Sequence, residues 1–152
     1  MTGQLTSYVD IDAPPERLWQ VLMDLPAYPG WNPFVTRAEG EFTEGARVTF
    51  HGPAAGALLR VRFPAVVLDV APCRRLRFRV RLARTGLPGL LDVEQTMTLR
   101  PRDDGGVRLW EEARFSGALV PLLTRSLNRE HTPAFLAMNA ALKERVERLQ
   151  RA

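Results

Sequence analysis

Residues 9–34 constrain the fold of this chain more than any other stretch, because their pattern passes from a strand to a helix and then to a proline-rich elbow. Over residues 5–12 apolar and polar positions alternate, which predicts a strand with one face on a core. An apolar stripe at helical spacing follows over residues 18–25, and Asp12 is predicted to cap the helix that carries it. The core face of this first strand is then Leu5, Ser7, Val9 and Ile11.

The segment after this helix cannot continue it. Residues 26–33 contain three prolines and Gly30, which predicts an elbow that carries Tyr28 and Trp31. The sequence therefore predicts two short helices between the first strand and a second strand near residues 34–42.

Five further segments have strand patterns and are bounded by turn residues. They are Arg47–His51, Leu59–Val70, Arg74–Arg84, Leu91–Arg100 and Val107–Ser116. Together with the first two strands they predict a seven-stranded antiparallel sheet.

The third of these segments alternates without error. Its apolar positions predict a core face, and its other positions form a row of arginines on the opposite face. We call Arg75, Arg77, Arg79 and Arg81 the arginine row. It is predicted to be a solvated outer face that pairs with Glu94, Glu112 or other carboxylates on neighbouring strands, and an anion-binding site is the alternative.

After Gly117 the apolar spacing changes from two to three or four residues, which predicts a helix with one buried stripe lying across the sheet. The stripe comprises Leu123, Leu127, Phe135, Met138, Leu142, Val146 and Leu149. Pro133 lies inside this pattern. Pro133 either kinks a single long helix or begins a second one with Thr132 as its cap, and a break near residues 131–133 is predicted.

The composition narrows the class of protein. A length of 152 residues fits one domain over residues 1–152. No apolar run approaches the ~20 residues that cross a bilayer and the start lacks a signal-peptide pattern, so we expect a cytoplasmic protein without stable membrane insertion. The net charge is +4, but basic runs and basic tails are absent from the sequence, so a nucleic-acid partner is not expected. The one cysteine, Cys73, permits no internal disulfide and is read as a turn residue.

The order of five segments carries a family resemblance. They are residues 11–19, Trp-Asn-Pro-Phe at 31–34, Gly-Leu-Pro-Gly-Leu-Leu at 86–91, residues 115–123 and residues 135–143. In this order the chain resembles bacterial single-domain members of the START-like, polyketide cyclase/dehydrase superfamily. The resemblance implies an α+β helix-grip fold, in which a curved seven-stranded antiparallel sheet wraps around a long C-terminal helix and encloses an apolar cavity.

The resemblance does not select one function, because the superfamily includes lipid carriers, receptors, aromatase/cyclases and other activities. Members often carry a histidine where this chain has Gln95 and an acid where it has Ala113. The polar pair of those relatives is therefore missing or altered here, and no catalytic role follows from it.

Two polar residues interrupt the apolar rows of the last two strands. If their hairpin turns symmetrically about Asp103, Met97 faces Leu109 and Gln95 faces Glu111. A buried carboxylate is costly unless it is paired or protonated. Glu111 is therefore read as a ligand contact, as a partner in a structural hydrogen bond, or as an exposed residue at a bulge.

The helical stripe and the aromatic residues supply the other candidates. His131 falls on the stripe and is read as a ligand contact or as a helix-end residue, and Asn139 lies at the stripe's edge. The apolar candidates for the lining are Trp31, Phe63, Phe78, Met97, Phe115, Phe135 and Met138. A cavity of roughly 300–1,000 Å³ with few polar groups suits an uncharged or weakly acidic hydrophobic molecule.

The sequence therefore predicts a protein that binds or transports a small hydrophobic ligand. Patterns for nucleophilic triads, metal sites and phosphate loops are absent, so no cofactor and no metal are expected. One alternative is an aromatase/cyclase-like enzyme that uses Glu111 as an acid or base. The other is an interaction module that uses the arginine row, with Arg77 and Arg79 binding an anionic partner.

Overall fold

The computed structural model describes residues 2–53, 60–81, 92–118 and 120–152. Its elements, in chain order, are β1 (Thr2–Ile11), α1 (Pro15–Met23), the 3₁₀ helix η1 (Leu25–Gly30), β2 (Arg37–Glu39), β3 (Arg47–Pro53), β4 (Arg60–Ala71), β5 (Arg75–Arg81), β6 (Asp92–Pro101), β7 (Val107–Ser116) and α2 (Val120–Arg151). Among these residues, no helix has the length and apolar character needed to cross a membrane.

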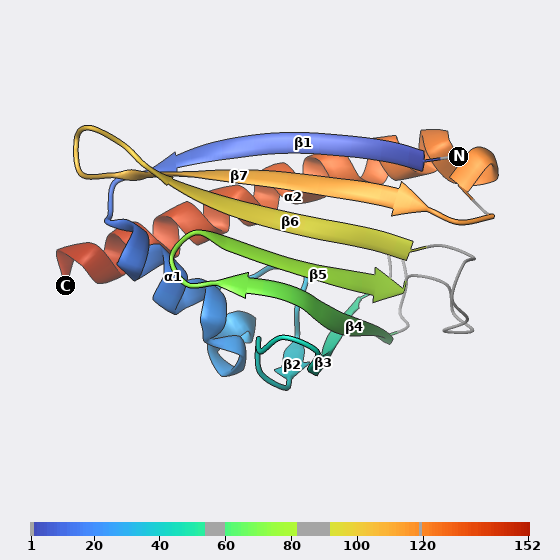
Figure 1. The fold of residues 1–152 in the computed structure, drawn as a ribbon, viewed down its shortest axis with the longest axis horizontal. Coiled ribbons are helices and arrows are strands. Elements are labelled where there is room, and N and C mark those ends of the chain that lie inside the picture. Colours follow the sequence, from blue (N-terminus) through green and yellow to red (C-terminus); the bar gives the residue numbers. More distant parts are fainter. Residues whose placement is uncertain (1, 54–59, 82–91, 119) are drawn as a thin grey trace.

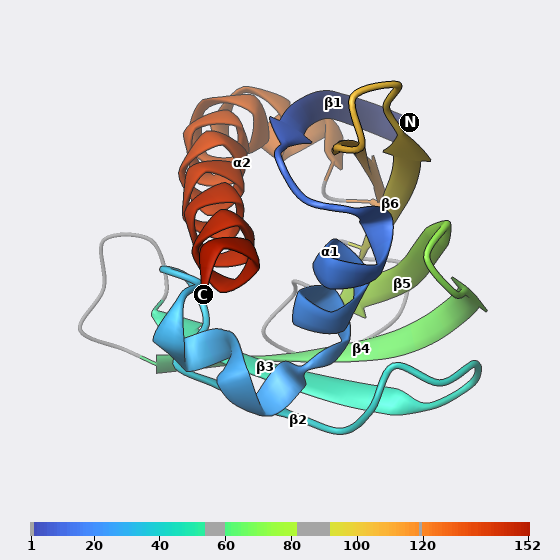
Figure 2. The ribbon, with the colours of Figure 1, turned by 90° about the vertical axis from the view of Figure 1, so that its left-hand side faces the viewer.

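The strands form one antiparallel sheet in the order β1-β7-β6-β5-β4-β3-β2 (Figure 1). Figure 2 shows that the sheet curves from β1 round to β2, with α2 along the open side of the curve and α1 inside it. This arrangement confirms the predicted α+β helix-grip architecture, including the two short helices between the first two strands.

The concave face of the sheet forms the core because the strand patterns alternate. In β6 and β7 every second side chain from Val93 to Leu99 and from Val107 to Phe115 is buried. Leu142 and Val146 of α2 are 0% exposed. The predicted inward faces of these strands are therefore confirmed.

The arginine row lies on the outer face and is largely paired. Arg77 forms an ion pair with Glu94 on β6, and Arg79 lies 3.8 Å from the same carboxylate. Arg75 pairs with Asp69 at 2.6 Å. Glu94 is thus a partner as predicted, whereas Glu112 pairs with Arg114 at 3.1 Å. These contacts are those of a solvated, charge-compensated sheet face.

The predicted break in the closing helix is wrong, because α2 continues through Pro133. A proline inside a helix costs about 3 kcal/mol, since it removes one hydrogen bond and crowds the preceding turn. α2 packs across β1 and against α1. We attribute the continuity to this packing.

Two details of the N-terminal half also differ from expectation. Asp12 does not cap α1: the helix begins after Pro14 without a side-chain cap, and the Asp12 amide instead donates to Glu147 at 3.0 Å. β2 covers only Arg37–Glu39 because Gly40 follows it with φ +107°. A Cβ at Gly40 would lie 2.7 Å from the Arg47 carbonyl oxygen. The predicted strand positions 59, 82–84 and 91 lie outside the described residues.

The β6–β7 hairpin is centred on Asp104, so the predicted centre at Asp103 is wrong. Met97 lies opposite Glu111, and Gln95 lies opposite Ala113. The physical reason is the turn. The Gly105 amide donates to the Arg102 carbonyl at 3.2 Å, and Gly105 has φ +88°. This is a three-residue loop with glycine in the left-handed position, and it shifts the register by two residues while keeping every side chain on its predicted face.

Candidate functional site

A buried polar cluster joins β1, β7 and α2. Glu111 lies at the middle of β7 and is 0% exposed. Ser7 is its register partner on β1, and Asn139 reaches it from α2. With its amide nitrogen turned toward the carboxylate, Asn139 donates to the two oxygens of Glu111 at 2.8 and 3.2 Å. In the opposite amide orientation its nitrogen lies 3.4 Å from Ser7 Oγ.

The cluster controls the protonation of Glu111. Burial raises the pKa of Glu111 to about 7, although hydrogen bonds from Ser7 and Asn139 act in the opposite direction. An ionised carboxylate accepts from the Asn139 nitrogen, and a protonated one donates to the Asn139 oxygen. Each orientation of the amide therefore matches one protonation state of Glu111.

Gln95 occupies a separate position on the concave face. It is 6% exposed and lies between Phe78 on β5 and Ala113 on β7. Its Nε2 atom is buried and has no hydrogen-bond partner within the described part of the chain. Its direct partner on β7, Ala113, has a short side chain, and Glu111 and Phe115 lie at the diagonal positions on the same face. Gln95 therefore presents an unused donor to the interior.

A wall of aromatic rings continues from Gln95 towards η1. The Phe78 ring centroid lies 5.6 Å from that of Phe42 and 5.8 Å from that of Phe50. Tyr28 links Phe50, at 6.4 Å, to Trp31, at 4.9 Å. These rings come from η1, from the segment after β2, and from β3 and β5, so the curvature of the sheet brings them together.

At the far end of this wall, one hydrogen-bonding group has a partner within the protein and the other has none among the described residues. The Tyr28 hydroxyl donates to the Leu22 carbonyl at 2.6 Å, and burial raises the pKa of this phenol. The Trp31 Nε1 atom is buried and has no partner among the residues that the structure describes. The Tyr28 hydroxyl is thus used in a hydrogen bond within the fold, whereas the Trp31 Nε1 donor is free among the described residues.

Most of the predicted site residues face the space between the sheet and α2. Six of them are buried: Phe78, Gln95, Met97, Glu111, Phe115 and Asn139. Three more are half-buried against the core: Trp31, Phe63 and Met138. His131 and Phe135 belong to α2, but their side chains lie outside the described ones. Gln95 and Glu111 share the concave face but lie at diagonal positions and do not face one another.

Sequence reasoning missed four contributors to this region: Ser7, Tyr28, Phe42 and Phe50. Ser7 gave the same signal as Glu111, because it is a polar residue on an apolar strand row. The three aromatic residues gave no such signal. Their meeting depends on how the elbow and β3 fold back over β5.

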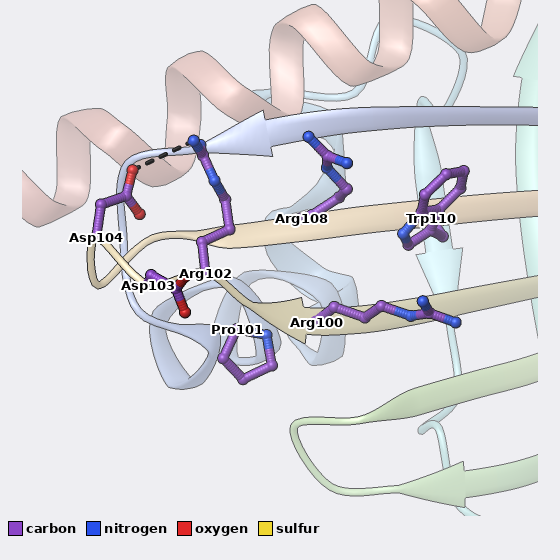
Figure 3. Close-up of a pocket in the computed structure, with 7 residues that line it drawn as sticks. All are labelled: Arg100, Pro101, Arg102, Asp103, Asp104, Arg108 and Trp110. Carbon is purple, nitrogen blue, oxygen red and sulfur yellow. Dashed lines mark ion pairs between the residues drawn. The ribbon is translucent and has the colours of Figure 1, made fainter.

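Two pockets are formed by described residues elsewhere. A volume of about 490 Å³ lies on the outer face at the β6–β7 hairpin (Figure 3). A smaller one of about 140 Å³ lies between the end of η1 and α2, where Trp31 faces Ala141 and Arg145. Neither pocket includes Gln95 or Glu111.

Comparison with known proteins gives a family and a fold. Residues 2–152 match the family model described as polyketide cyclase/dehydrase and lipid transport. A search of curated proteins finds no match.

Solved structures share the fold at low sequence identity. The Zhui aromatase/cyclase from a Streptomyces species is 19% identical, with TM-score 0.78, 100% of this chain covered and 98% of that one. A START superfamily protein from Mycobacterium smegmatis is 18% identical, with TM-score 0.71 and coverage of 96% and 98%. A protein of unknown function from Staphylococcus aureus is 8% identical, with TM-score 0.80 and coverage of 100% and 98%. At these identities the likeness shows the fold alone.

Proposed function

Because this chain belongs to the polyketide cyclase/dehydrase and lipid transport family, we propose that it binds a small hydrophobic molecule between the sheet and α2, with Gln95 as the main polar contact. The observation that carries the proposal is the buried Nε2 atom of Gln95, which lacks a partner within the described residues. Leaving such a donor unsatisfied costs about 1–3 kcal/mol. A ligand that offers a hydrogen-bond acceptor removes this cost.

The surroundings of Gln95 favour a flat, uncharged ligand. Phe78 lies directly beside Gln95, and the rings of Phe42 and Phe50 lie beyond it. Trp31 supplies a second unused donor at the far end of the aromatic wall. A ligand with a carbonyl oxygen satisfies Gln95, while its apolar body contacts the rings.

The role of Glu111 in this proposal is to shape the site. Its carboxyl is fully buried and is held by Ser7 and Asn139. Asn139 belongs to the closing helix, so the cluster fixes α2 against the β1–β7 side of the sheet. The rest of the concave face, from Gln95 on β6 to the aromatic wall, is then the part of the interior that receives the ligand.

The experiment compares two probes of nearly equal shape. The first is 2-acetonaphthone, which has a carbonyl group, and the second is 2-ethylnaphthalene, which lacks it. We expect the wild-type protein to prefer the ketone by about tenfold, the value of one well-placed hydrogen bond to a buried amide. Replacing Gln95 with Met keeps the volume and removes the donor, so Gln95→Met should bind both probes equally.

The matched control is Gln150→Met, which makes the same change at an exposed position of α2. It should keep the wild-type preference. Titrations followed by intrinsic fluorescence give the affinities, and native mass spectrometry of gently purified protein identifies any molecule that co-purifies. A ketone preference that survives in Gln95→Met contradicts the proposal, as does a wild-type protein that binds neither probe.

A second candidate function is acid–base catalysis by Glu111, as in a cyclase. The observation that favours it is the pKa of Glu111, which burial raises to about 7. A carboxyl with such a pKa donates and accepts protons near neutral pH. With a short poly-β-ketone as substrate, Glu111→Gln should abolish turnover and leave binding nearly intact. Equal turnover by the wild type and Glu111→Gln rejects catalysis but leaves the binding proposal standing.

A further inference from the structure

The outer face of the sheet carries a second candidate site, which is independent of the interior. The pocket of about 490 Å³ lies at the β6–β7 hairpin (Figure 3). Its lining is Arg100, Pro101, Arg102, Asp103, Asp104, Arg108 and Trp110. Because Arg108 and Trp110 alternate with the buried Leu109 and Glu111 along β7, the pocket lies on the opposite side of the sheet from the buried cluster.

Two aromatic rings lie at this pocket, one in its lining and one next to it. Trp110 on β7 and Tyr8 on β1 are register partners, and their ring centroids lie 5.0 Å apart. Tyr8 is 53% exposed. The Arg108 guanidinium lies over both rings, 4.5 Å from the Tyr8 centroid and 5.9 Å from that of Trp110. Trp110 is half-buried, so part of this residue and of Tyr8 remains accessible to a ligand beside the guanidinium groups.

The three arginines of the pocket differ in their partners. Arg108 donates to both oxygens of Asp10, at 2.6 and 2.9 Å. Arg102 pairs with Asp104 at 3.3 Å, which is the ion pair drawn in Figure 3. Arg100 lies over the Trp110 ring at 5.9 Å and forms no ion pair with any residue in the described ranges. Arg100 thus supplies a guanidinium that no ion pair within the described ranges occupies.

We propose that this pocket binds a planar aromatic monocarboxylate, which stacks against Trp110 and receives two hydrogen bonds from Arg100. A guanidinium that lies over a ring keeps its in-plane N–H groups free, and their spacing matches the two oxygens of a carboxylate. The ring contact already restricts Arg100, which lowers the entropy lost on binding.

The hairpin turn limits the charge that the ligand carries. Asp103 and Asp104 line the same pocket, and Asp103 is exposed. Their carboxylates repel a second negative charge placed near the turn. The pocket therefore favours a monocarboxylate over a phosphate dianion or a dicarboxylate.

The test uses 2-naphthoate as the probe and indole N–H resonances as the readout. The chain has three tryptophans, Trp19, Trp31 and Trp110, and Trp110→Phe identifies the resonance of the outer-face indole. Titration with 2-naphthoate should shift the Trp110 resonance. Neutral 2-naphthamide, which has the same shape, should bind about tenfold more weakly, because hydrogen bonds to a charged group are worth more than those to a neutral one.

Arg100→Gln should weaken 2-naphthoate binding about tenfold and weaken 2-naphthamide binding less, because the amide offers a neutral acceptor in place of a carboxylate. The matched control is Arg79→Gln, which removes an arginine from β5 on the same outer face but away from the pocket. It should bind 2-naphthoate as the wild type does. The proposal is overturned if Arg100→Gln binds 2-naphthoate normally, or if the probe shifts the Trp31 resonance and not that of Trp110. Normal binding by Arg100→Gln does not bear on Gln95, whereas a shift of the Trp31 resonance would place the probe at the interior aromatic wall, so the two proposals fail in distinguishable ways.

Discussion

The amide of Asn139 on α2 lies 2.8 Å from a carboxyl oxygen of Glu111 on β7 when its nitrogen faces that group. The contact connects the closing helix to the centre of the sheet through a carboxyl that is 0% exposed. Ser7 on β1 completes the cluster. Three elements that are distant in sequence therefore depend on the charge state of one side chain.

The first prediction concerns the pH dependence of stability. Burial raises the pKa of Glu111 from its ordinary value of 4.5 to about 7 in the folded protein. Between these values the folded state keeps a proton that the unfolded state has lost, so the free energy of unfolding falls as pH rises from about 4.5 to about 7. Glu111→Gln should remove this decrease, which amounts to about 3 kcal/mol. Urea unfolding of both proteins at about pH 5 and about pH 8 measures the difference. If the free energy of unfolding changes equally between these pH values in the wild type and in Glu111→Gln, the prediction is contradicted.

The second prediction concerns Asn139. Asn139→Ala removes a donor from Glu111, which raises the pKa of this carboxyl further and leaves its ionised form less well paired. We expect a loss of about 2 kcal/mol in the free energy of unfolding at about pH 8 and a smaller loss at about pH 5, where Glu111 is protonated. Gln150→Ala, at an exposed position of the same helix, serves as the control. A loss that is independent of pH would show that Asn139 acts through packing alone.

The third prediction tests the contact between the elbow and β3. A Cβ atom at Gly52 would collide with the carbonyl oxygen of Phe34, and backbone atoms on both sides limit any adjustment. Gly52→Ala should lower the free energy of unfolding by about 2 kcal/mol. Gly30→Ala is the matched control, since a Cβ there meets no atom within 4 Å. Thermal unfolding of both variants distinguishes a local clash from a general effect of losing glycine.

The fourth prediction concerns the other attachment of α2. Lys143 donates to the Asp10 carbonyl at 2.8 Å and to Glu147 at 2.6 Å, and Glu147 also accepts from the Asp12 amide. Burial acts to raise the pKa of Glu147, but the Asp12 amide and Lys143 outweigh it, so the pKa is lowered. The resulting stabilisation is present above the unfolded pKa and is lost as pH falls through the lowered folded value.

Glu147→Gln should therefore cost about 1–2 kcal/mol at neutral pH and almost nothing at about pH 3. Glu144→Gln removes a carboxylate that pairs with Arg148 on the surface, where the Glu144 side chain is 67% exposed. This control should change the free energy of unfolding by less than about 0.5 kcal/mol. Equal losses in the two variants would mean that the contacts of Glu147 with Asp12 and Lys143 add nothing.

The sequence predicted which side chains point inward, because the strand and helix periods are local properties. Gln95 and Glu111 fall on the apolar rows of their strands and Asn139 on the edge of the helical stripe, and all three are buried. The alternative of an exposed Glu111 at a bulge is wrong, because the side chain is 0% exposed. The register of the β6–β7 hairpin could not be predicted in the same way. A shift of two residues preserves every face, so alternation alone cannot distinguish a hairpin centred on Asp103 from one centred on Asp104.

Two other features were beyond local reasoning. Pro133 gives a strong local signal for a helix end, yet the packing of α2 on β1 and α1 maintains one helix. The contact of Asn139 with Glu111 depends on the position of α2 along its axis relative to β7. The spacing of apolar residues in the sequence does not specify this position. Propensities describe neighbours in sequence, whereas both of these outcomes depend on neighbours in space.

The strand order also has a consequence for the synthesis of this protein. β1 and β2 follow each other in the chain but form opposite edges of the sheet, and the partner of β1 is β7, which ends at Ser116. The strands from β2 to β7 each pair with the next one along the chain, so they can assemble as they emerge from the ribosome. β1 is translated first, but its hydrogen-bonding partner β7 is the last strand to be translated. Until β7 emerges, the backbone of β1 is exposed to other nascent chains and to chaperones.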